Sequence, residues 1–252
     1  MDSMNPIKIL HIESATHICS VAVSQDLDIL SHKESNEPNS HSKLLTVFIE
    51  EALQELQLRI KDLDAISVSV GPGSYTGLRI GVSTAKGLAY GAGIPVLPID
   101  TLKILANRVY KEILPGLSEK GDQSPWLRPM LDARRLEVYT ALYDSNLQEL
   151  DKVRAEIITE ESFISELNNQ TILFFGNGAE KCETLITHPN ARFIKNIESS
   201  SVFMTTLALE KFKKKEFADT AYFEPFYLKD FIATLPRNKV IPNQPDRGDF
   251  TD

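Results

Sequence analysis

The residues best suited to phosphate or metal chemistry lie near the amino end and in a glycine-rich stretch. Glu13, Ser14 and Thr16 follow the apolar run Ile7 to Ile12. A carboxylate and two hydroxyls at this place could position a metal-bound nucleotide, or they could only satisfy backbone groups at a buried hairpin end. The stretch "VSVGPGSYTGLRIG", from Val68 to Gly81, places four glycines where a strand should give way to a helix. Such turns often bind phosphate, so the stretch is a second candidate site.

The glycine spacing argues against two common phosphate-binding loops. A Walker loop needs four residues between its glycines and then Lys-Ser or Lys-Thr, whereas Gly73 and Gly77 enclose three residues and Leu-Arg follows. A dinucleotide fingerprint needs a third glycine, and Thr76 occupies that position after Gly71 and Gly73. Asp100, near the end of a later strand, keeps a dinucleotide site open as a minor alternative.

The elements that must position these residues are predicted from hydrophobic periodicity. Strands are expected at Ile7–Ile12, Cys19–Val23, Asp28–His32, Ala65–Val70 and Val96–Ile99, and helices from His41, from the glycine turn to about Ala92, and from Leu102 to Leu114. This order opens with an antiparallel meander, which favours a ribonuclease-H-like or actin-like layout over a Rossmann domain. The fourth strand ends without an acid, which argues against a two-metal nuclease.

An internal repeat predicts a duplicated fold. "ILHIESATHICSVAVSQD" carries a strand, an acid (Glu13), a strand and a turn, and "RPMLDARRLEVYTALYDS" repeats this order around Asp132. We therefore expect an α/β, two-lobed, actin-like (ASKHA, ribonuclease-H-like) duplicated fold. The expected parts are an N-terminal lobe over 1–114, a C-terminal lobe over 115–217, and a segment over 218–252 that packs back on the lobes and ends in a flexible tail from about 236. Asp132, Arg134 and Glu137 are expected to form a local polar network at the lobe interface.

Composition limits the function classes. The 252 residues include 27 Lys and Arg against 35 Asp and Glu, a net charge of −8 that disfavours gripping nucleic acid directly. Direct tRNA contact at the cluster Lys211, Lys213, Lys214 and Lys215 is a minor alternative. Two cysteines, the absence of a signal-peptide pattern and the lack of a bilayer-length apolar run predict a cytoplasmic protein without membrane association.

Small residues recur at intervals of four along the helix after the glycine turn. This spacing lets another helix approach closely, either inside the same domain or from a partner. Apolar residues of the preceding helix would then add to the contact. The predicted partner or dimer interface comprises Leu44, Val47, Phe48, Gly77, Gly81, Ala85 and Ala89.

Seven stretches, in order along almost the whole chain, resemble the TsaB (YeaZ) family of tRNA threonylcarbamoyladenosine biosynthesis. They are "HIESATHICSVAV", "HSKLL", "GPGSYTGLRIGVSTAKGLAYG", "GIPVLPIDTL", "DARRLEVYTALYD", "FFGNGAEK" and "EPFYLKDF". The glycine-turn stretch is the most diagnostic. Glu13-Ser14 departs from the usual Asp-Thr of the family, so Glu13, Ser14 and Thr16 are expected to be a vestigial nucleotide hairpin.

The resemblance implies a scaffold subunit without chemistry of its own. The family partners a catalytic paralogue, TsaD, and the ATPase TsaE, which together transfer threonylcarbamoyl from its AMP adduct to the adenosine next to the anticodon. The two metal-ligand positions of TsaD fall on Thr101 and Leu105, so we expect no metal or cofactor here, with ATP and metal on the partners. A homodimer is expected for the isolated chain, and tRNA contact only through the complex. The alternative is an actin-like ATPase or a glycoprotease-like peptidase acting alone.

Overall fold

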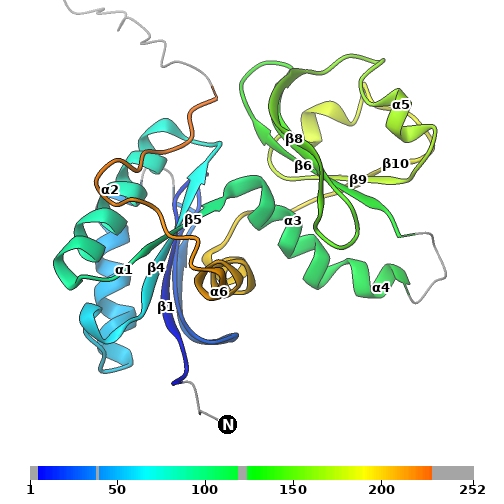
Figure 1. The fold of residues 1–252 in the computed structure, drawn as a ribbon. Helices are drawn as coiled ribbons and strands as arrows, with labels where there is room; N and C mark the ends of the chain where they lie inside the picture. The colour runs from blue at the N-terminus through cyan, green and yellow to red at the C-terminus, as the bar shows by residue number, and fades with distance from the viewer. Residues whose placement is uncertain (1–4, 38–39, 119–123, 229–252) are drawn as a thin grey trace, which may run out of the picture.

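The computed structural model describes residues 5–37, 40–118 and 124–228, which form two lobes, each built on a five-stranded sheet (Figure 1). The first sheet, in the order β3-β2-β1-β4-β5, consists of β1 (Lys8–Glu13), β2 (Cys19–Gln25), β3 (Asp28–Ser35), β4 (Ala65–Gly71) and β5 (Val96–Asp100). The second, in the order β8-β7-β6-β9-β10, consists of β6 (Trp126–Asp132), β7 (Glu137–Tyr143), β8 (Glu149–Ile157), β9 (Ile172–Phe175) and β10 (Ala191–Ile194).

Strand pairing is the same in both sheets. The first three strands of each sheet pair antiparallel as a meander. The fourth strand pairs parallel with the first, and the fifth pairs parallel with the fourth. The prediction of a duplicated, actin-like fold is therefore confirmed. Because β1 and β6 are equivalent, the turns after Glu13 and after Asp132 are equivalent too.

Two helices cover one face of the first sheet. The helix α1 (His41–Glu55) buries Leu45, Ile49 and Ala52 against it, as its apolar stripe predicts. The helix α2 (Tyr75–Ala92) begins where the Ser74 hydroxyl accepts a hydrogen bond from Gly77 N at 3.2 Å, and it ends at Gly93 in the left-handed region. Within the described residues, no helix has the length and apolar character needed to cross a membrane.

One helix is shared by both lobes. The helix α3 (Thr101–Glu112) places Leu102, Leu105 and Val109 in the core of the second sheet, whereas Ile104 packs into a cluster under the first sheet. Four short helices occur in the loops of the two lobes: η1 (Ile60–Asp62), α4 (Leu114–Ser118), α5 (Ile164–Leu167) and η2 (Glu180–Cys182). The junction between the lobes is therefore a packed helix.

The predicted C-terminal lobe of 115–217 extends too far. The chain leaves the second sheet after β10 and returns to the first as η3 (Ser201–Met204) and α6 (Thr205–Lys214). Met204, Leu207 and Ala208 pack against strands β1, β4 and β5, on the face opposite α1 and α2. Position along the chain assigned this helix to the second lobe, but tertiary packing decides which sheet it covers.

The segment 218–228 packs back on the first lobe, as expected. Ala218 bridges to Val96 at the edge of β5, and Phe223 enters the core beneath α2. The predicted flexible tail from about 236 lies outside the described residues.

Candidate functional site

In the turn between β1 and β2, the predicted nucleotide hairpin, three backbone N–H groups donate to acceptors of the folded chain. The carboxylate of Glu13 accepts a hydrogen bond from Ala15 N at 2.7 Å, and Ser69 Oγ accepts one from Ser14 N at 3.2 Å. Thr16 Oγ1 lies in the same turn and accepts from the backbone N–H two residues later at 3.2 Å. A phosphate bound here would first have to break hydrogen bonds that the folded chain already makes.

The Glu13 carboxyl is fully buried. Burial raises its pKa to about 7, although hydrogen bonds from Ala15 N and Ser69 act in the opposite direction. Its second oxygen, Oε2, has no hydrogen-bond partner among the described residues. Burial, together with Glu13, also raises the pKa of the neighbouring Cys19 thiol to about 11. The hairpin therefore holds a buried acid that is readily protonated, in contrast to an exposed anion facing a metal.

A run of three serines, Ser199 to Ser201, covers this hairpin from the far end of the chain. Ser199 Oγ lies 3.1 Å from Thr16 Oγ1, and Ser201 Oγ lies 2.7 Å from Ser20 Oγ on β2. All of these hydroxyls are buried. Protein groups therefore occupy the space beside the hairpin.

Ser20, His32 and Glu34 resemble a hydrolytic triad in composition but not in geometry. Ser20 Oγ lies 3.2 Å from His32 Nε2, and Glu34 Oε2 lies 3.3 Å from the same nitrogen. A triad needs the serine and the acid on opposite ring nitrogens. Burial raises the pKa of Glu34, but hydrogen bonds from His32, Ser200 and Ser20 outweigh it and bring the pKa to about 2. These three residues and Ser200 form a hydrogen-bonded cluster, called here the clamp. Sequence reasoning missed it because Ser200 lies 166 residues after Glu34 along the chain.

The positions that correspond to metal ligands in the resemblance lie in the core. Thr101 is the first residue of α3 and is fully buried, and Leu105 packs against the second sheet. Among the described residues, no three His, Cys, Asp or Glu side chains come together as a metal-binding group.

The glycine turn docks onto the β1–β2 hairpin. A Cβ on Gly73 would lie 2.2 Å from Ala15 O, and Ser74 N donates a hydrogen bond to that same oxygen at 2.7 Å. The turn therefore has its glycine because another part of the backbone lies against it. No phosphate is needed to explain the residue.

The predicted outward row of small residues is wrong in its direction. A Cβ on Gly77 would lie 2.1 Å from Ser14 O, and one on Gly81 would lie 2.1 Å from Ser14 Oγ. Ala85 and Ala89 are also buried. All four residues face the sheet. They lie on the same apolar face of α2 as the buried residues Leu78 and Val82.

A different set of small residues faces outward on α2. Ser83, Gly87 and Gly91 are exposed at intervals of four, and a Cβ on Gly87 or Gly91 would meet nothing within 4 Å. Of the predicted contacts on α1, Val47 is exposed, whereas Leu44 and Phe48 are half-buried against the core. The outer face of α1 and α2 is thus defined by Val47, Ser83, Gly87 and Gly91.

The equivalent turn in the second lobe is a local polar network, as expected. Asp132 Oδ1 accepts a hydrogen bond from Arg134 N at 3.0 Å and forms an ion pair with Lys181, which also donates to Glu137 O at 2.6 Å. Its carboxylate is therefore already paired.

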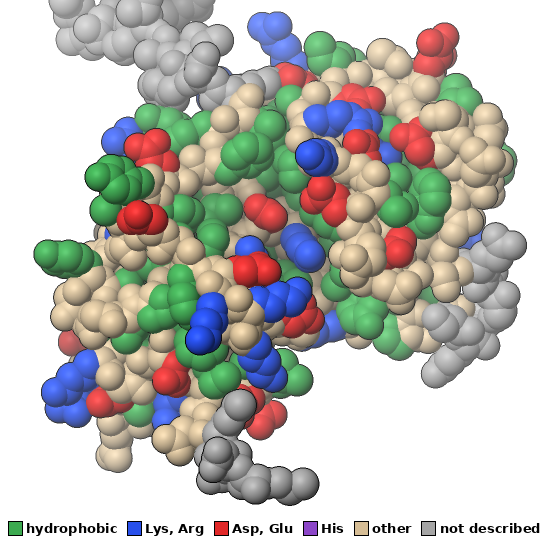
Figure 2. Space-filling model, in the orientation of Figure 1, with side chains coloured by type: hydrophobic (Ala, Val, Ile, Leu, Met, Phe, Trp, Pro, Cys, Tyr) green, Lys and Arg blue, Asp and Glu red, His purple; other side chains and the backbone are tan. Residues whose placement is uncertain are grey.

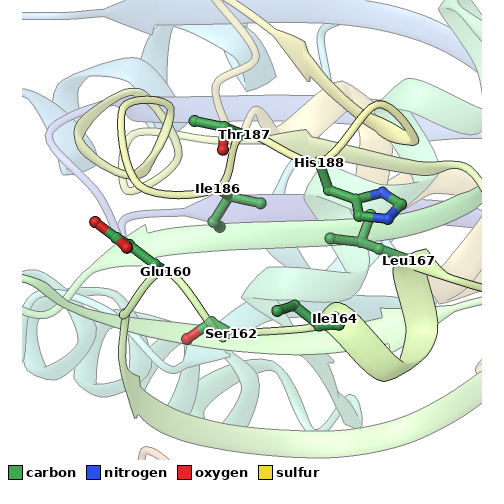
Figure 3. Close-up of a pocket in the computed structure, with 7 residues that line it drawn as sticks. All are labelled: Glu160, Ser162, Ile164, Leu167, Ile186, Thr187 and His188. Carbon is green, nitrogen blue, oxygen red and sulfur yellow. The ribbon is translucent and has the colours of Figure 1, made fainter.

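A small cavity of about 140 Å³ lies in the second lobe (Figure 3). Apolar side chains of Ile164, Leu167 and Ile186 form its floor, and Glu160 and His188 are the ionisable residues that line it. None of the residues that line it belongs to the turn after Glu13 or to the turn after Asp132.

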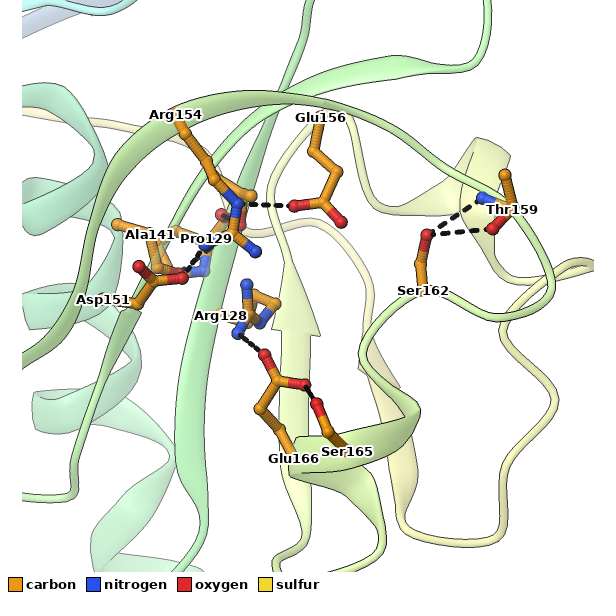
Figure 4. Close-up of polar contacts among 11 residues, drawn as sticks. Arg128, Pro129, Ala141, Asp151, Arg154, Glu156, Thr159, Ser162, Ser165 and Glu166 are labelled. Carbon is orange, nitrogen blue, oxygen red and sulfur yellow. Dashed lines mark hydrogen bonds and ion pairs between the residues drawn. The ribbon is translucent and has the colours of Figure 1, made fainter.

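Arg128, on β6, is a buried cation in the same lobe (Figure 4). Its Nη2 donates to Glu166 at 3.2 Å and its guanidinium lies 4.1 Å from the centre of the Phe163 ring. Nε and Nη1 have no partner among the described residues. Burial lowers its pKa to about 10. Three carboxylates, on Asp151, Glu156 and Glu166, surround Arg128 and Arg154, so the cluster has no excess positive charge for an anion.

The lysines of α6 do not form a continuous basic surface. Figure 2 shows Lys and Arg interspersed with Asp and Glu where the two lobes meet. Lys211 pairs with Glu216 at 3.5 Å and also lies near Asp100. A mixed surface of this kind gives no added support to direct tRNA contact.

Together, the repeated sheet topology and the two equivalent turns define a two-lobed ASKHA protein, in which serines from the far end of the chain cover the β1–β2 turn. A family model described as "TsaD: tRNA N6-adenosine threonylcarbamoyltransferase" matches residues 29–236. The chain belongs to this family, in its TsaB (YeaZ) branch.

Curated relatives place it in that branch. It is 25% identical over 238 residues to the tRNA threonylcarbamoyladenosine biosynthesis protein TsaB of Haemophilus influenzae, covering 91% of this chain and 96% of that protein. It is 26% identical over 233 residues to TsaB of Bacillus subtilis, covering 88% and 93%. The solved structure of YeaZ from Pseudomonas aeruginosa superposes with a TM-score of 0.75 at 24% identity, over 88% of this chain and 100% of that one, which shows a common fold.

Proposed function

We propose that this chain is the non-catalytic partner subunit of a TsaD-containing complex that forms threonylcarbamoyladenosine in tRNA. Its relatives are named for the biosynthesis of that nucleoside. The observation that carries the proposal is the covered hairpin: the backbone N–H groups of Ser14 and Ala15 donate within the fold, and Ser199 and Ser201 hydrogen-bond to Thr16 and Ser20 beside them. A member of the family with this site closed is suited to binding a paralogue rather than to transferring a group.

The same features support an assignment of metal and ATP binding to the other subunits. Thr101 and Leu105 are core residues, which supports metal and ATP being bound by the partners and no cofactor by this chain. We propose that the TsaE ATPase joins the complex, that tRNA is held by the whole assembly, and that the assembly works in the cytoplasm. A peptidase acting alone is disfavoured by the clamp geometry of Ser20, His32 and Glu34.

The outer face of α1 and α2 is the proposed docking surface for the paralogue. Ser83, Gly87 and Gly91 allow a helix backbone to approach α2 closely, and Val47 on the adjacent helix α1 is an exposed apolar side chain. Without the paralogue, the same face would support a homodimer, because a two-fold axis can reuse one patch.

The affinity of the Gly87→Arg variant for the cognate TsaD-type subunit tests this surface. A charged side chain in the middle of this face should weaken the binding free energy by at least ~3 kcal/mol, which is over a hundredfold in affinity. Gly116→Arg is the matched control, because Gly116 is equally open but lies on α4. Isothermal titration of the purified subunits measures the affinity, and circular dichroism verifies folding. Equal affinity for both variants would place the docking surface elsewhere.

Depletion of the protein in its own cells tests the function itself. We expect threonylcarbamoyladenosine to disappear from bulk tRNA while the threonylcarbamoyl-AMP intermediate still forms. Mass spectrometry of digested nucleosides follows the first, and chromatography of a cell extract reaction follows the second. Unchanged modification would refute the proposal whatever the subunit binds.

A further inference from the structure

The chain returns from the second lobe to the first through residues 195–204 (Figure 1). Ile197, early in this crossing, lies in the core of the second lobe, and Met204, at its end, lies in the cluster under the first sheet. Between these two anchors, residues 198–201, called here the cover, have one glutamate and three serines. The side chains of the cover can therefore hold it in place only by polar contacts.

The cover lies over a row of three side chains on the first sheet. Glu13 on β1 pairs with Ser20 on β2, and Ser20 pairs with Glu34 on β3. Residues directly opposite each other on antiparallel strands share one face of the sheet. Because side chains alternate along a strand, this is also the face of Ile9, which packs in the same cluster as Met204. The row is thus a carboxyl, a hydroxyl and a carboxylate, side by side under the cover.

The serines of the cover bond directly to this row. Ser201 Oγ lies 2.7 Å from Ser20 Oγ, and the Ser201 N–H donates to the same oxygen at 3.2 Å. Within the clamp, Ser200 Oγ donates to Glu34 Oε2. Glu13, next to Ser20 in the row, has no exposed surface, and its Oε2 has no hydrogen-bond partner among the described residues. The attachment of the cover therefore depends on groups immediately beside a buried carboxyl.

Several ionisable groups near the row and the cover keep one charge between pH 6 and pH 8. The ionisable groups that face Glu13 or the cover are His11 on β1, His17 in the turn, Cys19 on β2, His32 and Glu34 on β3, Arg108 on α3 and Glu198 in the cover itself. Burial and Lys111 lower the pKa of His11 to about 3, and burial and Glu13 raise that of Cys19 to about 11, so both stay neutral. Burial opposes the ionisation of Glu34, but hydrogen bonds from His32, Ser200 and Ser20 bring its pKa to about 2, so it stays negative.

The charge of Glu13 and of two histidines changes near neutral pH. Burial raises the pKa of Glu13 to about 7, so this carboxyl ionises beside the permanently negative Glu34. His17 lies 4.0 Å from Glu198, and His32 lies 3.3 Å from Glu34. These imidazoles balance the carboxylates only when protonated, and imidazole ordinarily loses its charge between pH 5 and pH 8. Loss of a proton from any of the three groups makes the cover and its row more negative.

We propose that the cover is a pH-sensitive latch, which is closed over the β1–β2 turn below neutral pH and is released locally as the pH rises above it. On release, the serines leave Thr16, Ser20 and Glu34, and water reaches Glu13, while Ile197 and Met204 stay in their cores. A solvated Glu13 would have a pKa near 4.5, its ordinary value, so its ionisation favours the open form. Linkage between the two pKa values makes opening roughly tenfold more favourable at pH 8 than at pH 6.

Hydrogen–deuterium exchange of the full-length protein at pH 6 and pH 8 tests the latch. Protection factors are corrected for the faster chemical exchange at the higher pH. We expect the protection of amides in residues 198–204 and 14–20 to fall roughly tenfold. The equivalent turn after Asp132 should keep its protection, because that carboxylate is half-exposed and paired with Lys181. Low concentrations of urea should not speed exchange in the cover, since a local opening exposes little surface.

The neutral isostere Glu13→Gln should abolish most of this fall, because its amide does not ionise. Glu210→Gln is the matched control, since Glu210 is exposed on α6 and should leave the pH response unchanged. Circular dichroism verifies that both variants fold. The comparison of the two pH values in the wild type stands even without the variants.

Three results would overturn the latch. Equal protection of the cover at both pH values would show that it does not respond. Exchange in the cover that rises with urea as steeply as in the core strands would mean that the whole molecule opens. A fall in protection that Glu13→Gln leaves intact would assign the response to another group. None of these results involves a partner subunit, so the latch and the proposed function are tested separately.

Discussion

Glu13 occupies an environment that an ionised carboxylate does not favour. It has no solvent contact, one of its oxygens lacks a partner among the described residues, and the pKa is raised from 4.5 to about 7. A raised pKa means that the folded state binds the proton more tightly than the unfolded state does. The folded protein therefore loses stability as the pH rises from about 4.5 to about 7, and the loss is complete above that range.

Replacing this acid with its neutral isostere should remove that pH dependence. We expect Glu13→Gln to be more stable than the wild type at pH 8, by on the order of 2 kcal/mol, and to match it near pH 4.5. The amide oxygen can still accept from Ala15 N. Urea unfolding at several pH values measures the difference, with the exposed Glu210→Gln as control. A difference between Glu13→Gln and wild type that is constant with pH would contradict the raised pKa.

Residue types near the hairpin were predictable, but their partners were not. The sequence indicates that Glu13, Ser14 and Thr16 end a first strand, because the apolar run before them stops there. The covering residues Ser199 and Ser201 lie more than 180 residues away along the chain, and no local pattern links the two segments. Whether the turn is open or closed therefore depends on a tertiary contact.

At the scale of elements, the two faces of α2 carry glycines for opposite reasons. Gly81 leaves no room for a side chain beside Ser14, whereas Gly87 has open space. We expect Gly81→Ala to destabilise the protein by about 1–3 kcal/mol through overpacking. Gly87→Ala should stabilise it by up to ~1 kcal/mol, because alanine favours the helix interior.

Thermal and urea unfolding of the two alanine variants provide the comparison. Because both substitutions add one methyl group to the same helix, helix propensity alone would give them the same sign. Opposite signs are expected from the packing. Equal stabilisation by both would mean that Gly81 is not pressed against the first strand.

Periodicity did not predict which side of α2 its glycines occupy. The spacing of four between Gly77 and Gly81 correctly indicated a close approach, but the approaching group is the end of β1 and not a helix. Leu78 and Val82 lie on the same face of the helix as these glycines. Because the two apolar side chains are buried against the sheet, the glycines face the sheet as well. A helix pattern gives the angle between residues, and only the neighbouring elements decide which angle faces the sheet.

At the scale of the whole molecule, we expect the isolated protein to bind Mg-ATP weakly or not at all. The hairpin donors are engaged, and Glu34 and Glu198 add negative charge beside the covering serines. Calorimetric titration with Mg-ATP should give no saturable heat at micromolar concentrations. Saturable heat that Glu13→Ala abolishes would restore the ATPase alternative.

The overall plan was predictable because duplication leaves a repeated strand–acid–strand pattern in the sequence. The lobe boundary was not, since α6 follows the second sheet along the chain but packs under the first. Hydrophobic periodicity is the same in either location. Chain order therefore predicted two lobes and assigned one helix to the wrong one.

The sharing of α3 between the lobes has a mechanical consequence. Sugar kinases and actins work by hinged closure, which requires that two bodies touch little apart from their hinges. Here Ile104 is embedded under one sheet while Leu105 is embedded under the other, and Arg108 Nη1 also donates to Glu198 O at 2.9 Å. Opening the lobes would pull a helix out of one core. The contacts of α3 with both cores therefore oppose any change in the angle between the lobes.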